Sequence, residues 1–110
     1  MNHPTDRAAR QQTLDSLIDE AIGARQMLPP YERCVELNQA LRAAIGDLYL
    51  NAQEEARKLP EHSRGWRSVH NTLADADDVL AEDLGSGLLS AAIQLGALAR
   101  TARALATETR

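Results

Sequence analysis

A run of uncharged residues near the C-terminus constrains the fold more than any other feature of the sequence. Residues 84–99 read LGSGLLSAAIQLGALA, in a chain in which 25% of the residues are charged. A membrane span needs about 20 predominantly apolar residues, whereas this run is shorter and contains Gly, Ser and Gln. We therefore expect no membrane span. We expect the run to begin the last helix and to form the surface that the other helices cover.

Apolar residues in and after this run repeat at intervals of three and four, which places them on one side of a helix. They are Leu88, Ala91, Ala92, Leu95, Leu98, Ala99, Ala102, Leu105 and Ala106. The flanks and far side carry no charge before Arg100, and a helix that is apolar nearly all round is usually buried nearly all round. Either the other helices wrap this helix closely, or a second chain covers its outer face.

The composition indicates one small helical domain. A chain of 110 residues can bury one hydrophobic core, and 44% of the residues are hydrophobic. Phe is absent, and Tyr31, Tyr49 and Trp66 are the only aromatic residues, so Ala and Leu must build a core of closely packed helices. We expect a single domain over residues 1–110, with residues 1–4 and 107–110 frayed.

Proline and glycine divide the chain into four helical segments, at Pro29-Pro30, at Pro60 and at residues 85–87. We predict helices from Thr5 to about residue 28, from 30 to 58, from a Ser63 cap through the acidic stretch to about 83, and from a serine cap at Ser86 to about 106. Helices joined by short turns run antiparallel to their neighbours. The predicted fold is an all-α, antiparallel up-down four-helix bundle.

Charge and cysteine content limit the partners and the compartment. The net charge of −4 argues against a nucleic-acid partner, because phosphate contacts need a basic surface. Cys34 is the only cysteine, so no disulfide forms within the chain, which fits a reducing cytoplasm. Residues 1–12 lack the apolar core of a secretory signal. We therefore expect a cytoplasmic protein.

The sequence contains no pattern of residues typical of catalysis. His62 and His70 lack the Glu-x-x-His spacing of di-metal bundles. Cys34 lies on the predicted core stripe without a neighbouring base, as a buried and unreactive thiol would. With no nucleophile–base pair or phosphate-binding loop either, we predict no catalytic residue, cofactor or metal, and an enzyme is the least favoured reading.

Five segments of the chain form a family pattern. They are Leu28-Pro29-Pro30, Leu41-Arg42 with Ile45 and Leu48, Arg57–Pro60, Val79-Leu80 and Leu98–Leu105. Together they resemble a family of short actinobacterial helical proteins of unknown function, often labelled natural-product biosynthesis proteins. The resemblance covers roughly residues 27–106 and implies a biosynthetic or regulatory context without a known reaction. Two segments differ: the acidic residues 75–78 stand where members often have basic ones, and Thr107-Glu108 stand where a His often follows.

The outer face of the last helix is the strongest functional signal in the sequence. It carries large apolar residues, small residues that allow another helix to approach, and one arginine, and contiguous apolar surface usually marks a contact site. The predicted interface residues are Leu89, Ile93, Gly96, Ala97 and Arg100. We expect a homodimer, the commonest closed assembly of like chains, or another protein partner. The alternative is that neighbouring helices cover this face.

Two further sets of residues are candidate sites. Asp75, Asp78 and Glu82 form either an acidic docking patch or a solvated helix face. Arg100 and Arg103 could bind a phosphate or carboxylate, but we expect them to pair with the acidic patch from a neighbouring helix or chain. Tyr49 and Trp66 would line a ligand pocket, unless Trp66 only covers the core. The preferred hypothesis is a non-enzymatic helical interaction or regulatory module. The alternatives are a small-molecule-binding bundle and an accessory protein in natural-product biosynthesis.

Overall fold

The computed structural model describes residues 4–109 of the chain, and the side chains from residue 13 onward. In this part the chain forms α1 (Pro4–Gly23), α2 (Tyr31–Arg57), α3 (Arg64–Leu80) and α4 (Leu88–Glu108), with no β-strand. The prediction of an all-α, four-helix fold is confirmed. None of the helices described has both the length and the apolar character that crossing a membrane requires.

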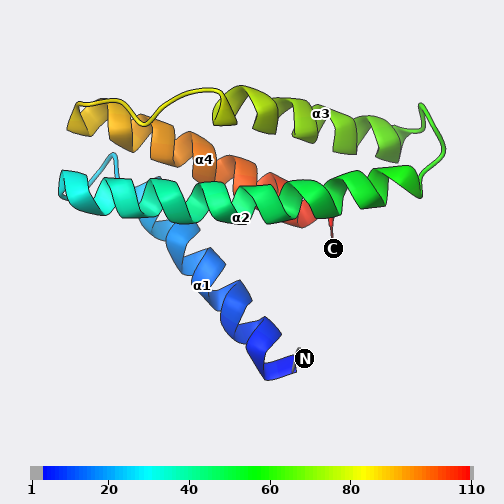
Figure 1. Ribbon diagram of the computed structural model, residues 1–110, viewed down its shortest axis with the longest axis horizontal. Coiled ribbons are helices and arrows are strands. Elements are labelled where there is room, and N and C mark those ends of the chain that lie inside the picture. Colours follow the sequence, from blue (N-terminus) through cyan, green and yellow to red (C-terminus); the bar gives the residue numbers. More distant parts are fainter. Residues whose placement is uncertain (1–3, 110) are drawn as a thin grey trace.

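α4 is the central helix of the fold. In Figure 1, α2, α3 and α4 lie lengthwise beside one another and each turn reverses the chain, whereas α1 meets them at a steep angle. α4 packs against α1, α2 and α3, but α1 and α3 make no contact among the described residues. Three helices therefore surround α4, and the side between α1 and α3 is left open.

Aliphatic side chains fill the core, as the absence of Phe predicts. α2 contributes Leu37, Leu41 and Ile45, all without solvent exposure, and α4 contributes Leu95, Leu98 and Leu105. Between these leucines, buried alanines allow the helix backbones to approach closely. They are Ala21, Ala24, Ala52, Ala56, Ala76, Ala91, Ala92, Ala99 and Ala102. Cys34 is also fully buried, as predicted.

The start of α4 differs from the prediction. Residues 84–87 are not helical, Gly85 has a φ of 84°, and Gly87 rather than Ser86 occupies the N-cap without a side-chain hydrogen bond. Leu88 was expected on the core stripe, but it lies in the first turn of the helix and is 41% exposed. A left-handed φ suits glycine, because it has no Cβ to clash with the backbone.

The other helix ends also refine the prediction. Ser63 caps α3 as expected, since its hydroxyl accepts a hydrogen bond from the Trp66 amide at 3.3 Å. α1 ends at Gly23, five residues earlier than predicted, because glycine weakens a helix and the Pro29-Pro30 break follows. Residues 107–108, expected to be frayed, belong to α4, and the Ser68 hydroxyl donates to Glu108 at 2.6 Å. α1 begins at Pro4, so residue 4, expected to be frayed, belongs to the helix, which starts one residue before the predicted Thr5. The expected fraying of residues 1–3 and 110 lies outside the described residues.

Two side chains from neighbouring helices hold the C-terminal end of α3. Arg42 of α2 donates from Nη1 to the carbonyl of Leu80 at 3.0 Å and from Nη2 to the carbonyl of Glu82. Gln94 of α4, which is nearly buried, donates from Nε2 to the carbonyl of Val79 at 3.1 Å. The last carbonyls of a helix have no following helical turn to supply amide donors, so these side chains serve as donors at the end of α3, where the Glu82 amide also donates to the Val79 carbonyl at 3.2 Å. The bond from Gln94 accounts for a polar residue in the uncharged run.

Replacing Arg42 tests this arrangement. Arg42→Met keeps much of the aliphatic side chain but leaves the carbonyls at the end of α3 without their charged donor, so we expect a loss of about 1–2 kcal/mol in the free energy of unfolding. Urea denaturation followed by circular dichroism measures the change. The matched control is Arg57→Met on the same helix, where the side chain is exposed and its ion pair within the described part of the chain is with Glu54. We expect less than about 0.5 kcal/mol there, and equal losses in both variants would contradict the proposed role of Arg42.

Candidate functional site

An apolar strip on the outer face of α4 is the most prominent exposed feature of the central helix. Leu89 is 58% exposed and Ile93 is 47% exposed. Ala97 is half-buried and Arg100 is exposed. We call these four residues the α4 strip. Spacings of four, four and three residues place them along one side of the helix, so a single partner surface can contact all four.

Gly96, the fifth residue of the predicted interface, is buried beneath the side chain of Arg100. A Cβ atom added at Gly96 would lie 3.3 Å from Nη1 of Arg100. The guanidinium of Arg100 therefore rests on the helix over Gly96 rather than extending into solvent. Because Gly96 has no side chain, the guanidinium of Arg100 can lie against the backbone of α4 at this position.

α1 and α3 flank the α4 strip on opposite sides. On one side, Nη2 of Arg103 lies 3.7 Å from Oδ1 of Asp19 in α1. On the other side, a groove of about 240 Å³ lies between α3 and α4. The groove is lined by Thr72, Asp75 and Val79 of α3 and by Ala97, Arg100, Thr101 and Ala104 of α4. Because α1 and α3 do not touch, the strip lies in the open side of the fold.

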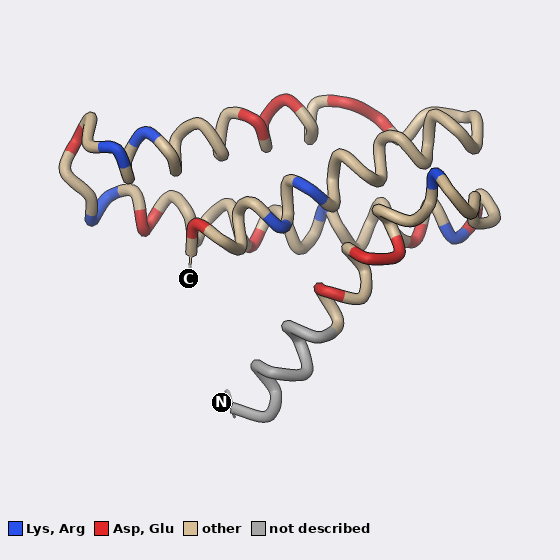
Figure 2. The backbone as a smooth tube through the Cα atoms, turned by 180° about the vertical axis from the view of Figure 1, so that it is seen from behind, with Lys and Arg blue, Asp and Glu red and all other residues tan. Residues whose placement is uncertain are grey.

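Within the described chain, Arg100 and Arg103 do not pair with the acidic patch, and the predicted pairing with the patch of a neighbouring chain stays a prediction. Arg103 forms an ion pair with Asp19 and not with the acidic patch of Asp75, Asp78 and Glu82. In the described part of the chain, neither Arg100 nor any of the three patch residues forms a salt bridge. All three acidic residues are exposed, and Figure 2 shows acidic segments on α3 and in the connection after it. The patch is therefore free to attract a basic group from outside.

A second exposed apolar segment, which the sequence analysis did not identify, lies in the connection from α1 to α2. Met27 is 83% exposed, and Leu28 lies beside it at the edge of a groove of about 440 Å³. The hydroxyl of Tyr31 donates to the carbonyl of Gly85 at 2.7 Å, which fastens the start of α2 to the connection before α4. In the sequence, Met27 and Leu28 stand directly before Pro29-Pro30, and this pattern could have indicated an exposed apolar turn.

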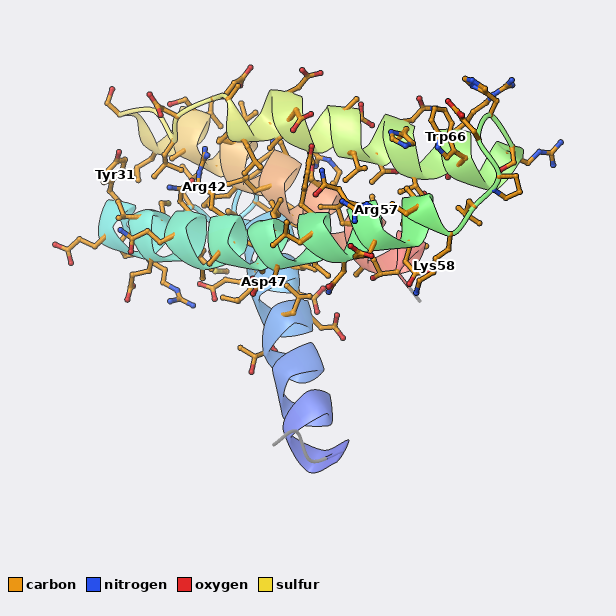
Figure 3. All side chains as sticks on the ribbon, turned by 45° about the vertical axis from the view of Figure 1, so that its right-hand side comes forward. Tyr31, Arg42, Asp47, Arg57, Lys58 and Trp66 are labelled. Atoms are coloured by element: carbon orange, nitrogen blue, oxygen red, sulfur yellow. The ribbon has the colours of Figure 1, made fainter. Side chains whose placement is uncertain are left out.

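Tyr49 lines a groove of about 400 Å³ between α2 and α3, but Trp66 does not. The side chains of Gln53, Arg57, His70 and Asp77 supply the polar lining. Trp66 lies next to the groove, because its ring centroid is 4.1 Å from that of His70 and 4.9 Å from that of His62 (Figure 3). The groove is open to solvent and has a mixed polar and apolar lining, so Tyr49 lines a groove as predicted, whereas Trp66 only contacts one of its lining residues, His70.

Two titratable groups near the core are perturbed by their surroundings. The Asp77 carboxylate accepts a hydrogen bond from the Tyr49 hydroxyl, and together with partial burial it raises the pKa of that phenol. Burial raises the pKa of the Cys34 thiol, which disfavours the reactive thiolate. Among the described residues, no three His, Cys, Asp or Glu side chains are grouped so that they could hold a metal ion.

The pKa of Tyr49 provides a test of this groove. In a Tyr31→Phe background Tyr49 is the only tyrosine, and Asp77→Asn is expected to lower its pKa toward the ordinary value of about 10. The raised pKa means that the folded chain keeps a proton that the unfolded chain has lost, so its contribution to stability is present below about pH 10 and declines at higher pH. Ultraviolet absorbance of the phenolate measures the titration.

Asp78→Asn, on the exposed side of α3, is the control and should leave the titration of Tyr49 unchanged. An unaltered titration in the Asp77→Asn variant would exclude the proposed cause.

Comparison with known proteins places the chain in a family without assigning an activity to it. No curated protein and no solved structure matches the sequence. Residues 12–110, a range that includes α2, α3, α4 and most of α1, match the model of one family, described as a family of unknown function, DUF6415. This agrees with the resemblance to a family of unknown function, whereas the actinobacterial origin and the biosynthetic context stay predictions. The chain belongs to the DUF6415 family of unknown function.

Proposed function

We propose that this protein is a helical interaction module that binds another protein surface through the α4 strip and carries out no chemistry itself. The observation that supports the proposal is the exposure of Leu89 and Ile93 on the open side of a helix whose other sides pack against α1, α2 and α3. Covering their exposed parts would contribute roughly 1–2 kcal/mol each. Exposed apolar residues that follow one another along a helix are typical of contact sites.

The surroundings of the strip fit a helical partner. α1 and α3 stand on either side of the strip without touching, and a helix laid along α4 would contact both. Recognition of this kind uses residues three or four positions apart along one face of a helix, and the residues of the α4 strip follow one another at four, four and three positions. The unpaired acidic patch on α3 favours a partner with basic groups beside its apolar face, because charge complementarity selects partners and orients them.

A comparison of three bait proteins tests this function. The wild-type chain, Ile93→Asp and Leu50→Asp are used to capture proteins from an extract of the cells that make this protein, together with a differently tagged copy of the chain. Leu50 is the matched control, because it is 63% exposed on α2, outside the strip. Wild type and Leu50→Asp should retain the same specific partner, and Ile93→Asp should lose it. Equal retention by all three baits would show that the strip is not the binding surface.

The groove between α2 and α3 supports small-molecule binding as a second candidate function. Its volume of about 400 Å³ falls within the range of ligand sites, and its polar groups would suit a ligand with both donors and acceptors. Trp66 fluorescence would report such binding, because Trp66 stacks on His70 at the groove wall. A metabolite from the same cells should change that emission in the wild type and not in a His70→Ala variant. An accessory role in natural-product biosynthesis rests on the sequence resemblance alone.

A further inference from the structure

We propose that a second copy of this chain binds the outer side of α3, with the two α3 helices antiparallel about a two-fold axis at Asn71. This inference goes beyond the proposed function, because it concerns a different helix and names the chain that covers it. It rests on the order of the charged residues along α3, which are basic in the first half of the helix and acidic in the second half.

A stripe of exposed residues runs along α3 on the side opposite the core. The buried residues of this helix are Val69, Leu73 and Ala76. At about 3.6 residues per turn, the opposite side carries the exposed residues that we call the α3 stripe: Arg64, Arg67, Asn71, Asp75 and Asp78. They follow one another at three, four, four and three positions, so the spacing is the same from either end.

The charge order of the α3 stripe does not stabilise the helix itself. Negative side chains are favourable at the N-terminal end of a helix and positive side chains at the C-terminal end. α3 has the reverse order, with Arg64 in its first turn, no acidic residue there, and Asp78 in its last turn. A partner outside the helix would account for charges that are unfavourable within it.

The four charges of the α3 stripe also lack ion-pair partners within the described part of the chain. The salt bridges there involve other residues, and Figure 2 shows the basic segments at the start of α3 and the acidic ones toward its end. Asp75 and Arg100 line the same groove but form no ion pair. Each charge of the stripe is exposed to water and is therefore free to pair with another molecule.

An antiparallel pair of α3 helices matches these charges. Arg64 and Asp78 stand seven positions before and after Asn71. Arg67 and Asp75 stand four positions before and after it. A two-fold axis perpendicular to α3 at Asn71 therefore sets Arg64 level with Asp78 of the other copy. The same axis sets Arg67 level with Asp75 of the other copy, and the symmetry repeats both contacts.

Other orientations and occupants match the α3 stripe less well. Parallel α3 helices would place each residue at the level of its own copy, so arginines would face arginines and aspartates would face aspartates. A nucleic acid would be attracted by the basic half and repelled by the acidic half, on a chain whose net charge is −4. An antiparallel second copy is complementary to both halves at once, and this complementarity argues for it as the occupant.

The middle of the α3 stripe allows the two helices to approach closely. Asn71 carries an amide that both donates and accepts hydrogen bonds, so the two copies of this side chain can bond to each other at the axis. Ala74, three positions further on, is small and exposed. Neither residue places a bulky group between the two helices.

The contact is small, so the dimer is expected to be weak and sensitive to salt. α3 is about 26 Å long at ~1.5 Å per residue, and a helix face about 10 Å wide presents roughly 260 Å². A stable interface usually buries about 800 Å² on each side, and exposed ion pairs contribute little individually. Salt shortens the range of the attraction from about 30 Å at 0.01 M to about 8 Å at 0.15 M. We expect dimers at hundreds of micromolar in low salt and monomers in high salt.

An exchange of charges across the axis tests the pairing. Arg64→Asp and Asp78→Arg change the net charge in opposite directions, yet each places like charges together. Each is therefore expected to raise the dissociation constant about tenfold. The double variant Arg64→Asp/Asp78→Arg restores opposite charges at both contacts and keeps the net charge of −4. It should dimerise like the wild type in sedimentation velocity at low salt.

The matched control for this exchange is Arg25→Asp/Asp78→Arg. It has the same net charge as the wild type, but Arg25 is an exposed residue of the connection between α1 and α2, so no contact on α3 is restored. This control should dimerise as weakly as Asp78→Arg alone. Equal dissociation constants for the two double variants would exclude Arg64 and Asp78 as partners between copies.

Single cysteines determine the position of the axis. Asn71→Cys places the two thiols together at the axis, so it should form disulfide-linked dimers under mild oxidation in low salt. In Ala74→Cys the two positions lie about 9 Å apart along the helices, beyond the reach of a disulfide. The wild type is the control for the fully buried Cys34, and Leu50→Cys is the control for an exposed thiol on α2. Linkage of Ala74→Cys or Leu50→Cys as fast as that of Asn71→Cys would overturn the proposed axis.

These measurements separate the inference from the proposed function. A wild-type chain that stays monomeric at hundreds of micromolar in low salt would overturn self-association and leave the α4 strip untested by that result alone. If such a monomer captures another protein that Arg64→Asp loses and Arg25→Asp keeps, the α3 stripe binds that protein and not a second copy. Ile93→Asp should dimerise like the wild type, because Ile93 lies on α4 outside the contact. A dimer lost in Ile93→Asp would assign self-association to the α4 strip and overturn the α3 contact.

Discussion

The burial of α4 by three other helices is the interaction on which the rest of the structure depends. α4 supplies Leu95, Leu98 and Leu105 to the core, and the alanines between them let the surrounding helices approach closely. Side chains this small fill space only when helices pack closely, because protein interiors reach the density of organic crystals. The charged residues of the chain therefore lie on the outer helices, and α4 remains uncharged until Arg100. Enclosure by three helices also leaves one open side, where the α4 strip is exposed.

The fold could be predicted from the sequence because its signals are local. Proline breaks, the Ser63 cap and the three-and-four periodicity place α2 and α3 within a few residues of their observed bounds. The end of α3 was placed about three residues too late, and it lies where tertiary contacts meet. Arg42, 38 residues earlier in the chain, bonds the Leu80 carbonyl at that end, a contact that no local pattern predicts. The burial of Gln94 likewise depends on a carbonyl of α3 that no local pattern identifies.

The candidate site could be predicted only in part, for a similar reason. Helical spacing sufficed to place Leu89, Ile93, Ala97 and Arg100 on one side of α4, and the structure shows that side between α1 and α3. Spacing could not show that Arg100 folds over Gly96, or that Arg103 pairs with Asp19 instead of the acidic patch. Trp66 was assigned to a pocket with Tyr49, yet it stacks on the imidazole of His70. Side-chain packing across helices decides each of these details.

The lack of contact between α1 and α3 has a consequence for how a bound protein would affect the fold. Among the described residues α1 packs against α2 and α4 but not α3, and an element with fewer neighbours is expected to open more readily than the rest of a fold. A protein seated on α4 would bridge α1 and α3 and so oppose that opening. By thermodynamic reciprocity, any change that detaches α1 weakens binding by the same factor as binding steadies α1. The packing of α1 and the binding of a protein on α4 would therefore depend on each other.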